Sequence, residues 1–268
     1  MSRQLQFTGY LNTPTLWLGE GPMGLNQLYL KKLPTPRFIQ SLDGKYRLGN
    51  LVERFVTAEL KEYDHIEILA ENLQIQRDKL TLGELDCLLR IDGRPIHLEV
   101  IYKFYLYDPQ VGITALDHWI GPNRRDSLVL KLNKLANKQL PLLYKPETEA
   151  YLNALDLKAD QMQQLVCFKA QLYLPFGQEV NVAPLNPESI YGSYISFEGF
   201  SAFIGCKCYF PRKHDWLVKP HTAVDWVTFE QAQERLQEFH EKQSAPLVWI
   251  KQPSGLMEKV FVVWWNQV

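Results

Sequence analysis

The chain has 268 residues, 46% of them hydrophobic, so it can bury a sizeable core as one large domain or as a core with an extension. Its formal net charge of −1 excludes an overall positive potential that would attract nucleic acid. Any contact with nucleic acid must therefore use local basic patches. The chain start lacks the apolar core of a signal peptide, and no window approaches the ~18 apolar residues of a membrane span. The four cysteines form no CxxC pair, which indicates free thiols in a reducing cytoplasm.

The first hundred residues begin with an irregular stretch. Residues 1–45 are rich in proline and glycine and predict an arm packed on the core, with a short helix at Leu28–Leu33. An amphipathic helix is expected over Leu48–Lys61, because its apolar side chains recur at helical spacing. Glu53 lies at the edge of that apolar face, a place where acidic residues usually only border the solvent. Ile66–Ile75 reads as a first strand.

A β-hairpin over Gly83–Tyr105 is the strongest local prediction. Two apolar-rich runs are joined by Asp92-Gly93, the dipeptide favoured in two-residue type I′ turns. Counting outward from that turn places Asp86 directly opposite Glu99, on a face that also carries Glu84, His97 and Lys103. The other face is apolar throughout and consists of Leu85, Cys87, Leu89, Ile96, Leu98, Val100, Tyr102 and Phe104.

The opposed acids Asp86 and Glu99 are the main candidate site. Directly opposed residues hold their Cβ atoms roughly 4.5–5.5 Å apart, where like charges destabilise a sheet. The pair would repel unless one acid is protonated or a cation lies between them. Carboxylate-rich sites suit Mg²⁺ or Mn²⁺, and Mg²⁺ often completes its shell with water and substrate phosphate. The alternative is a solvated sheet face whose charges point into water.

The residues that follow the hairpin predict helices and a further strand. A helix is expected over Asp126–Leu140 and a second one over Glu147–Gln164, and Val166–Leu174 alternates as a strand does. The first helix carries a basic stripe that is either a solvated face or a phosphate-tracking surface. This stripe and the arginines before it are Arg124, Arg125, Lys131, Lys134 and Lys138.

The last third of the chain reads as additional strands and one helix. Strands are expected over Tyr194–Phe210, Leu247–Lys251 and Val260–Trp265, and a helix over Phe229–Lys242 follows a capping-box-like Thr228. The order of helix, antiparallel three-strand meander, helices and strand indicates an α/β fold with a C-terminal α+β extension. We expect an arm at 1–45, a core at 46–175 and the extension at 176–268.

The order of these elements resembles the core of the PD-(D/E)XK nucleases, which have a restriction-endonuclease-like fold. It consists of a helix with an acidic residue, then a meander with two carboxylates, then a lysine on the strand of the second carboxylate. More closely, GELDCLLRIDGRPIHLEVIYKFYL and GPNRRDSLVLKLNKL resemble a bacterial uncharacterised family, domain of unknown function 1853. This close resemblance covers roughly residues 45–145. It names a family without an assigned activity, whereas the nuclease motif is short and recurs by chance.

The nuclease resemblance implies a role for each of the acids and for one lysine. Asp86 and Glu99, with Glu84 as a further oxygen, would bind the metal, and Glu53 would complete the site through the water shell of the ion. Lys103 would orient or deprotonate the attacking water. The superfamily lysine normally stands two residues after the acid, whereas Lys103 stands four after it, about 13 Å along a strand.

Two functions follow from these expectations. The first is a Mg²⁺-dependent or Mn²⁺-dependent hydrolase that cleaves DNA or RNA, with a water molecule activated at the paired carboxylates. The second is an inactive nuclease-like fold that binds nucleic acid or protein. His97, next to Glu99, is either a base or ligand of the site or a half-buried strand histidine.

Overall fold

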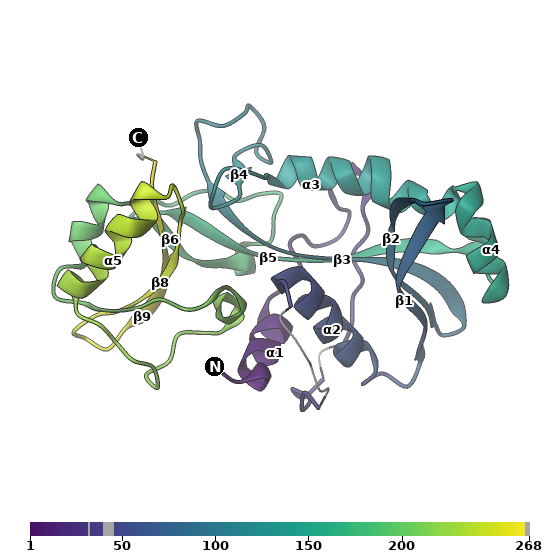
Figure 1. The fold of residues 1–268 in the computed structure, drawn as a ribbon, viewed down its shortest axis with the longest axis horizontal. Coiled ribbons are helices and arrows are strands. Elements are labelled where there is room, and N and C mark those ends of the chain that lie inside the picture. The colour runs from purple at the N-terminus through teal and green to yellow at the C-terminus, as the bar shows by residue number, and fades with distance from the viewer. Residues whose placement is uncertain (32, 40–45, 266–268) are drawn as a thin grey trace. The chain divides into compact units, whose positions relative to one another are not determined.

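The computed structural model describes residues 1–31, 33–39 and 46–265. The chain divides into two compact units, each assembled from separate stretches (Figure 1). Unit 1 consists of residues 1–14, 103–129 and 170–268, and unit 2 of residues 15–102 and 130–169. Two strands, β3 (Arg94–Tyr107) and β5 (Gln163–Pro175), continue from one unit into the other. The division into arm, core and extension stays a prediction, and part of its arm, residues 32 and 40–45, lies outside the described residues.

The predicted meander is present in unit 2. β1 (Ile66–Arg77) pairs antiparallel with β2 (Leu80–Ile91), which pairs antiparallel with β3. The β2–β3 turn has φ of 49° at Asp92 and 77° at Gly93, the two positive values that a type I′ turn requires. The ladder from this turn out to Cys87 and Leu98 has the predicted register.

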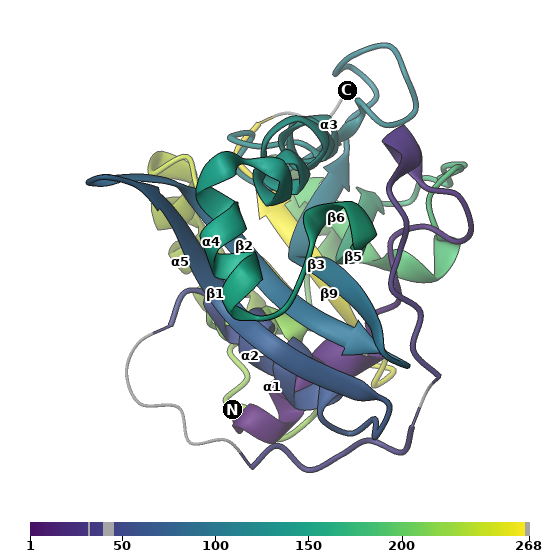
Figure 2. The same ribbon diagram turned by 90° about the vertical axis from the view of Figure 1, so that its right-hand side faces the viewer.

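Helices and helical turns accompany the meander in unit 2. α2 (Leu48–Leu60) forms as predicted and buries its apolar face. The helix expected over Asp126–Leu140 starts as α3 (Leu128–Lys134) and then changes its winding, with a π-helical turn at Leu135–Gln139 and a 3-10 turn at Leu140–Tyr144. α4 (Pro146–Ala154) follows, and Figure 2 shows it beside β1, which it contacts.

Of two predicted helices in unit 2, one is shorter than expected and the other does not form in the described residues. The one expected over Glu147–Gln164 stops at Ala154, since Asp156 takes a left-handed φ of 53°. A 3-10 turn at Ala159–Gln161 then leads into β5. The expected helix at Leu28–Leu33 is not formed by residues 28–31, where the Leu28 N–H donates to the Val166 carbonyl at 2.9 Å.

One apolar core of unit 2 joins the meander to the helical turns. It consists of Ile75, Leu85, Leu88, Leu142, Leu143, Leu152, Leu157 and Met162. Because Leu142 and Leu143 belong to the 3-10 turn, this packing fixes the end of the winding helix against β2. The 3-10 turn that follows Gln139 is thereby held in place by buried apolar contacts.

Unit 1 contains most of the C-terminal strands. β5 pairs in parallel with β6 (Ile190–Ser196), which pairs in parallel with β9 (Met257–Val263). β9 pairs antiparallel with β8 (Leu247–Lys251), and β8 with β7 (Lys207–Tyr209). The short β4 (Trp119–Ile120) pairs with β3. The single strand expected over Tyr194–Phe210 is wrong, because a 3-10 turn at Glu198–Phe203 separates β6 from β7.

The helices α1 (Arg3–Asn12) and α5 (Phe229–Glu241) belong to unit 1. α1, which the sequence reading missed, is capped by Ser2. α5 begins with the predicted capping box of Thr228 and Gln231. Further 3-10 turns lie at Pro22–Gly24, Pro187–Ser189 and Lys213–Leu217, the first of them in unit 2.

The predicted fold class is confirmed at its coarse level, a mixed α/β fold whose strand pairs are mostly antiparallel. Within the described part of the chain, no helix has both the length and the apolar character needed to cross a bilayer.

Candidate active site

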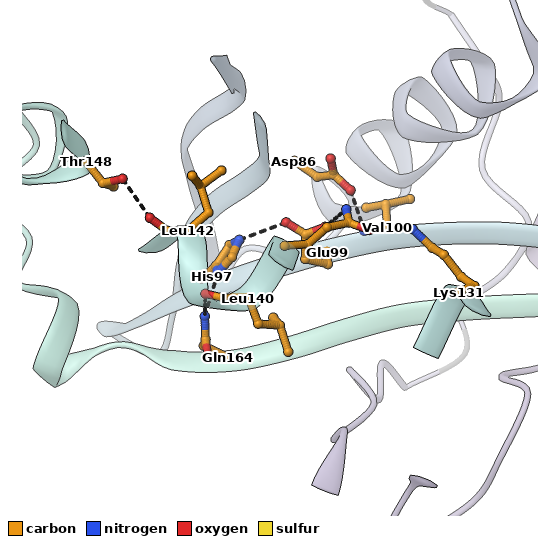
Figure 3. A network of polar contacts seen from close by, with 10 residues as sticks. Asp86, His97, Glu99, Val100, Lys131, Leu140, Leu142, Thr148 and Gln164 are labelled. Atoms are coloured by element: carbon orange, nitrogen blue, oxygen red, sulfur yellow. Dashed lines mark hydrogen bonds and ion pairs between the residues drawn. The ribbon is translucent and has the colours of Figure 1, made fainter. Parts of the chain in front are cut away.

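Asp86 and Glu99 lie on the neighbouring strands β2 and β3 of unit 2. The backbone ladder ends one pair before them. There, the Oδ2 atom of Asp86 accepts the backbone N–H of Val100 at 2.8 Å (Figure 3). The Asp86 carboxylate thus takes a hydrogen bond that a continued ladder would give to a backbone carbonyl. Asp86 is thereby tied to the strand that carries Glu99.

Glu99 is completely buried, and both of its carboxylate oxygens are hydrogen-bonded. Its Oε1 atom lies 3.0 Å from Nε2 of His97, and the Gln139 side-chain amide donates to Oε2. The Gln164 amide nitrogen donates to the Leu140 carbonyl at 2.7 Å and lies 2.9 Å from Nδ1 of His97. Nδ1 therefore acts as an acceptor, which places the imidazole proton on Nε2 and directs it at Glu99.

Lys131 reaches the same network from α3. Its amine donates to Oε1 of Gln139 at 2.7 Å, so the Gln139 amide bridges Lys131 and Glu99. Of the three lysines predicted as a stripe, Lys134 and Lys138 are exposed, whereas Lys131 is half-buried. The structure therefore separates Lys131 from the other two by environment.

The acids of this site are crowded and partly desolvated. Burial, followed by repulsion from Glu99, raises the pKa of Asp86 to about 8, and Glu53 acts in the same direction. The positive charge of Lys131 opposes that shift. Burial also raises the pKa of Glu53, as does repulsion from Glu84 and Glu99. Neighbouring negative charges thus favour the protonated form of both Asp86 and Glu53.

A family model described as Domain of unknown function (DUF1853) matches residues 20–263, most of the chain. The chain belongs to this family. No curated protein and no solved structure matches it. The DUF1853 assignment agrees with the family that residues 45–145 resemble, and the match extends through both units.

The oxygen atoms at the site of this DUF1853 protein are of the type that binds a divalent cation, but they are not spaced as ligands of one ion. Carboxylate oxygens are the ligands that Mg²⁺ prefers, and the neighbouring acids raise the pKa of Asp86 and of Glu53. Among residues 1–31, 33–39 and 46–265, however, no three histidine, cysteine or acidic side chains are grouped so that they could hold an ion. To bind an ion, Glu99 would have to share oxygens that are already hydrogen-bonded.

The other predicted site residues belong to unit 1. The amine of Lys103 forms an ion pair with Asp126 at 2.7 Å. Arg124 pairs with Asp108 at 2.6 Å, and Arg125 is exposed. The predicted basic surface is therefore divided between the two units, with the arginines in one and the lysines in the other.

Sequence reasoning missed Gln139 and Gln164. Neither amide carries a charge or belongs to a motif, and both lie outside the hairpin whose register could be counted. The available signal was indirect, because a buried acid and a buried histidine need hydrogen-bonding partners. His97 is fully buried, more than the half-buried position expected of it.

Proposed function

We propose that this protein is a metal-dependent phosphodiesterase that hydrolyses DNA or RNA. The observation that carries the proposal is that the buried carboxyl of Asp86 faces Glu99 across the hairpin, and that the charges of Glu99 and Glu53 raise its pKa, a repulsion that a divalent cation would relieve. Asp86 and Glu53, with Glu99 and Glu84 beside them, would hold Mg²⁺ or Mn²⁺. When bound, such an ion lowers the pKa of a coordinated water and stabilises negative charge on phosphate.

The surrounding polar residues support this proposal by fixing Glu99. His97 and Gln139 hold one oxygen each, so the carboxylate has a single orientation. Second contacts of this kind orient the ligands of metal sites and tune their basicity. The PD-(D/E)XK-like arrangement that the sequence resembles remains part of the proposal.

A second candidate function is a binding module with a nuclease-like fold and no catalysis. The complete burial of Glu99 favours it, because an acid with both oxygens occupied has a sufficient structural role. The basic side chains Lys134 and Lys138 would then contact nucleic acid directly.

One experiment separates the two functions. Cleavage of plasmid, single-stranded DNA and RNA is measured with Mg²⁺, with Mn²⁺ and with EDTA, for the wild type and for Asp86→Asn. The asparagine keeps an oxygen for the Val100 N–H and removes the charge, so the fold should persist. Glu149→Gln, an exposed acid on α4, is the matched control.

The enzyme proposal expects metal-dependent cleavage that Asp86→Asn abolishes and Glu149→Gln retains. Salt-dependent binding without cleavage, weakened by Lys134→Glu, would assign the binding module instead. Cleavage that Asp86→Asn leaves at the wild-type rate would refute this site. If the wild type neither cleaves nor binds any of these nucleic acids, both nucleic-acid functions are refuted and a protein partner is left as the candidate.

A further inference from the structure

Four lysines are candidates for the amine that acts together with the carboxylates of Asp86 and Glu99. Lys103, which the superfamily pattern suggests, is engaged by Asp126 in unit 1. Lys134 and Lys138 are exposed on the helical segment of unit 2. Lys131, by contrast, belongs to the hydrogen-bond network of Glu99 through Gln139.

Lys131 is linked to Glu99 by hydrogen bonds and to Asp86 by its charge. Its amine donates to Gln139, whose amide donates in turn to Glu99. The same charge attracts Asp86 and opposes the repulsion between that acid and Glu99. Figure 3 shows the Lys131 side chain extending toward β3 at Val100, the residue whose N–H is bound by Asp86.

The π-helical turn at Leu135–Gln139 explains how one helical segment presents both Lys131 and Gln139 to the same strand. Eight residues of a regular α-helix make about 2.2 turns, which would leave the two side chains roughly 80° apart. A π turn closes i→i+5 bonds and so takes in about one extra residue, which rotates Gln139 back toward the face of Lys131. Such turns are rare and frequently lie at functional sites.

We infer that Lys131, presented by this winding segment, is the catalytic amine of the site and binds the phosphate group of the substrate beside Asp86 and Glu99. This inference rests on the proposed function. Without substrate, the ammonium compensates the crowded acids through Gln139. With substrate, the same charge lies where a phosphodiester oxygen carries negative charge.

A lysine that only compensates buried acids would be structural, and the two roles differ in what they affect. Loss of a lysine that is only structural lowers stability and leaves the kcat/KM of the folded protein unchanged, whereas loss of a phosphate-binding lysine also lowers kcat/KM. Lys131→Gln can still hydrogen-bond the Gln139 oxygen without carrying a charge. Lys131→Arg retains the charge and tests for rescue.

The experiment measures Mg²⁺-dependent cleavage and, in EDTA, the affinity for a fluorescent oligothymidylate. The variants are Lys131→Gln, Lys131→Arg and Lys103→Gln, with Lys158→Gln as an exposed control in the same unit. We expect Lys131→Gln to lower kcat/KM about 100-fold, the usual effect of removing one electrostatic donor. Lys131→Arg should recover part of that loss, and the control should match the wild type. Urea midpoints confirm that each variant is folded.

Two sets of results would overturn the inference. An active wild type with an equally active Lys131→Gln, or with the loss found only in Lys103→Gln, assigns the amine elsewhere. If the wild type does not cleave at all, the proposed function fails and the affinity decides alone. A selective loss of affinity in Lys131→Gln then supports phosphate binding by this residue, and an affinity equal to that of Lys158→Gln refutes it.

Discussion

Replacement of Asp86 by asparagine should change how the stability of the protein depends on pH. The side chain keeps its shape and an oxygen for the Val100 N–H, which Asp86 accepts at 2.8 Å. The variant loses the charge that burial, Glu99 and Glu53 disfavour. Because the folded protein holds the Asp86 proton more tightly than the unfolded chain does, the wild type is stabilised at low pH.

The size of this effect follows from the shift. The pKa of Asp86 rises from 3.8 to about 8, and each unit corresponds to about 1.4 kcal/mol of differential stability. The full shift gives an upper limit of about 6 kcal/mol, present below pH 4 and lost as the pH rises to about 8. Rotamer changes that expose the carboxylate to water would reduce it, so we expect a loss of roughly 2–4 kcal/mol.

Urea unfolding at pH 4 and at pH 9 measures this loss. The free energy of unfolding of the wild type should fall more between the two pH values than that of Asp86→Asn. At pH 9, Asp86→Asn should be the more stable protein. Asp160→Asn, an exposed acid in the 3-10 turn before β5, should follow the wild type. Identical pH profiles for wild type and Asp86→Asn would refute the account of a crowded, desolvated acid.

Three further predictions concern other buried groups. Glu99→Gln turns one amide donor toward a donor from His97 or Gln139, so its free energy of unfolding should fall by about 1–3 kcal/mol. Glu149→Gln should match the wild type, and equal melting temperatures for wild type and Glu99→Gln would contradict the prediction. Burial lowers the pKa of Lys259 to about 7, so the free energy of unfolding of the wild type should rise between pH 7 and 10. In urea titrations Lys259→Met should lack this rise, and the same pH dependence in both proteins would argue against the prediction. Burial raises the pKa of the Cys87 thiol to about 12, so iodoacetamide should label this thiol only in urea. Peptide mass mapping measures the labelling, and rapid labelling of the folded protein would contradict the prediction.

The hairpin was predictable because its determinants are local. Asp92-Gly93 fixes the turn, and the alternation of the two strands then fixes every pair out to Cys87 and Leu98. The departure begins where a side chain competes with the backbone. Counting residues extends the ladder to Asp86 and Glu99, whereas the Asp86 carboxylate captures the Val100 N–H in its place.

The environment of the acids could not be predicted, since it depends on contacts distant in sequence. Gln139 and Gln164 reach the hairpin from segments whose own winding was misjudged as regular helix. Periodicity detects the apolar face of a helix and does not register a single π turn. The sequence therefore predicted that Asp86 and Glu99 lie on neighbouring strands, and it did not predict that Glu99 is sealed from solvent.

The interleaved order of the two units has a consequence for synthesis on the ribosome. All of unit 2 has been made once residue 169 is added, but unit 1 must wait for residues 170–268. At ~5–20 residues per second, that wait lasts roughly 5–20 s. During this time the apolar side chains of Leu106, Trp119 and Ile120, which are buried in the finished protein, lack most of their unit. Slower elongation prolongs this exposure, so recombinant yield should respond to chaperone supply, and chains that terminate early should aggregate.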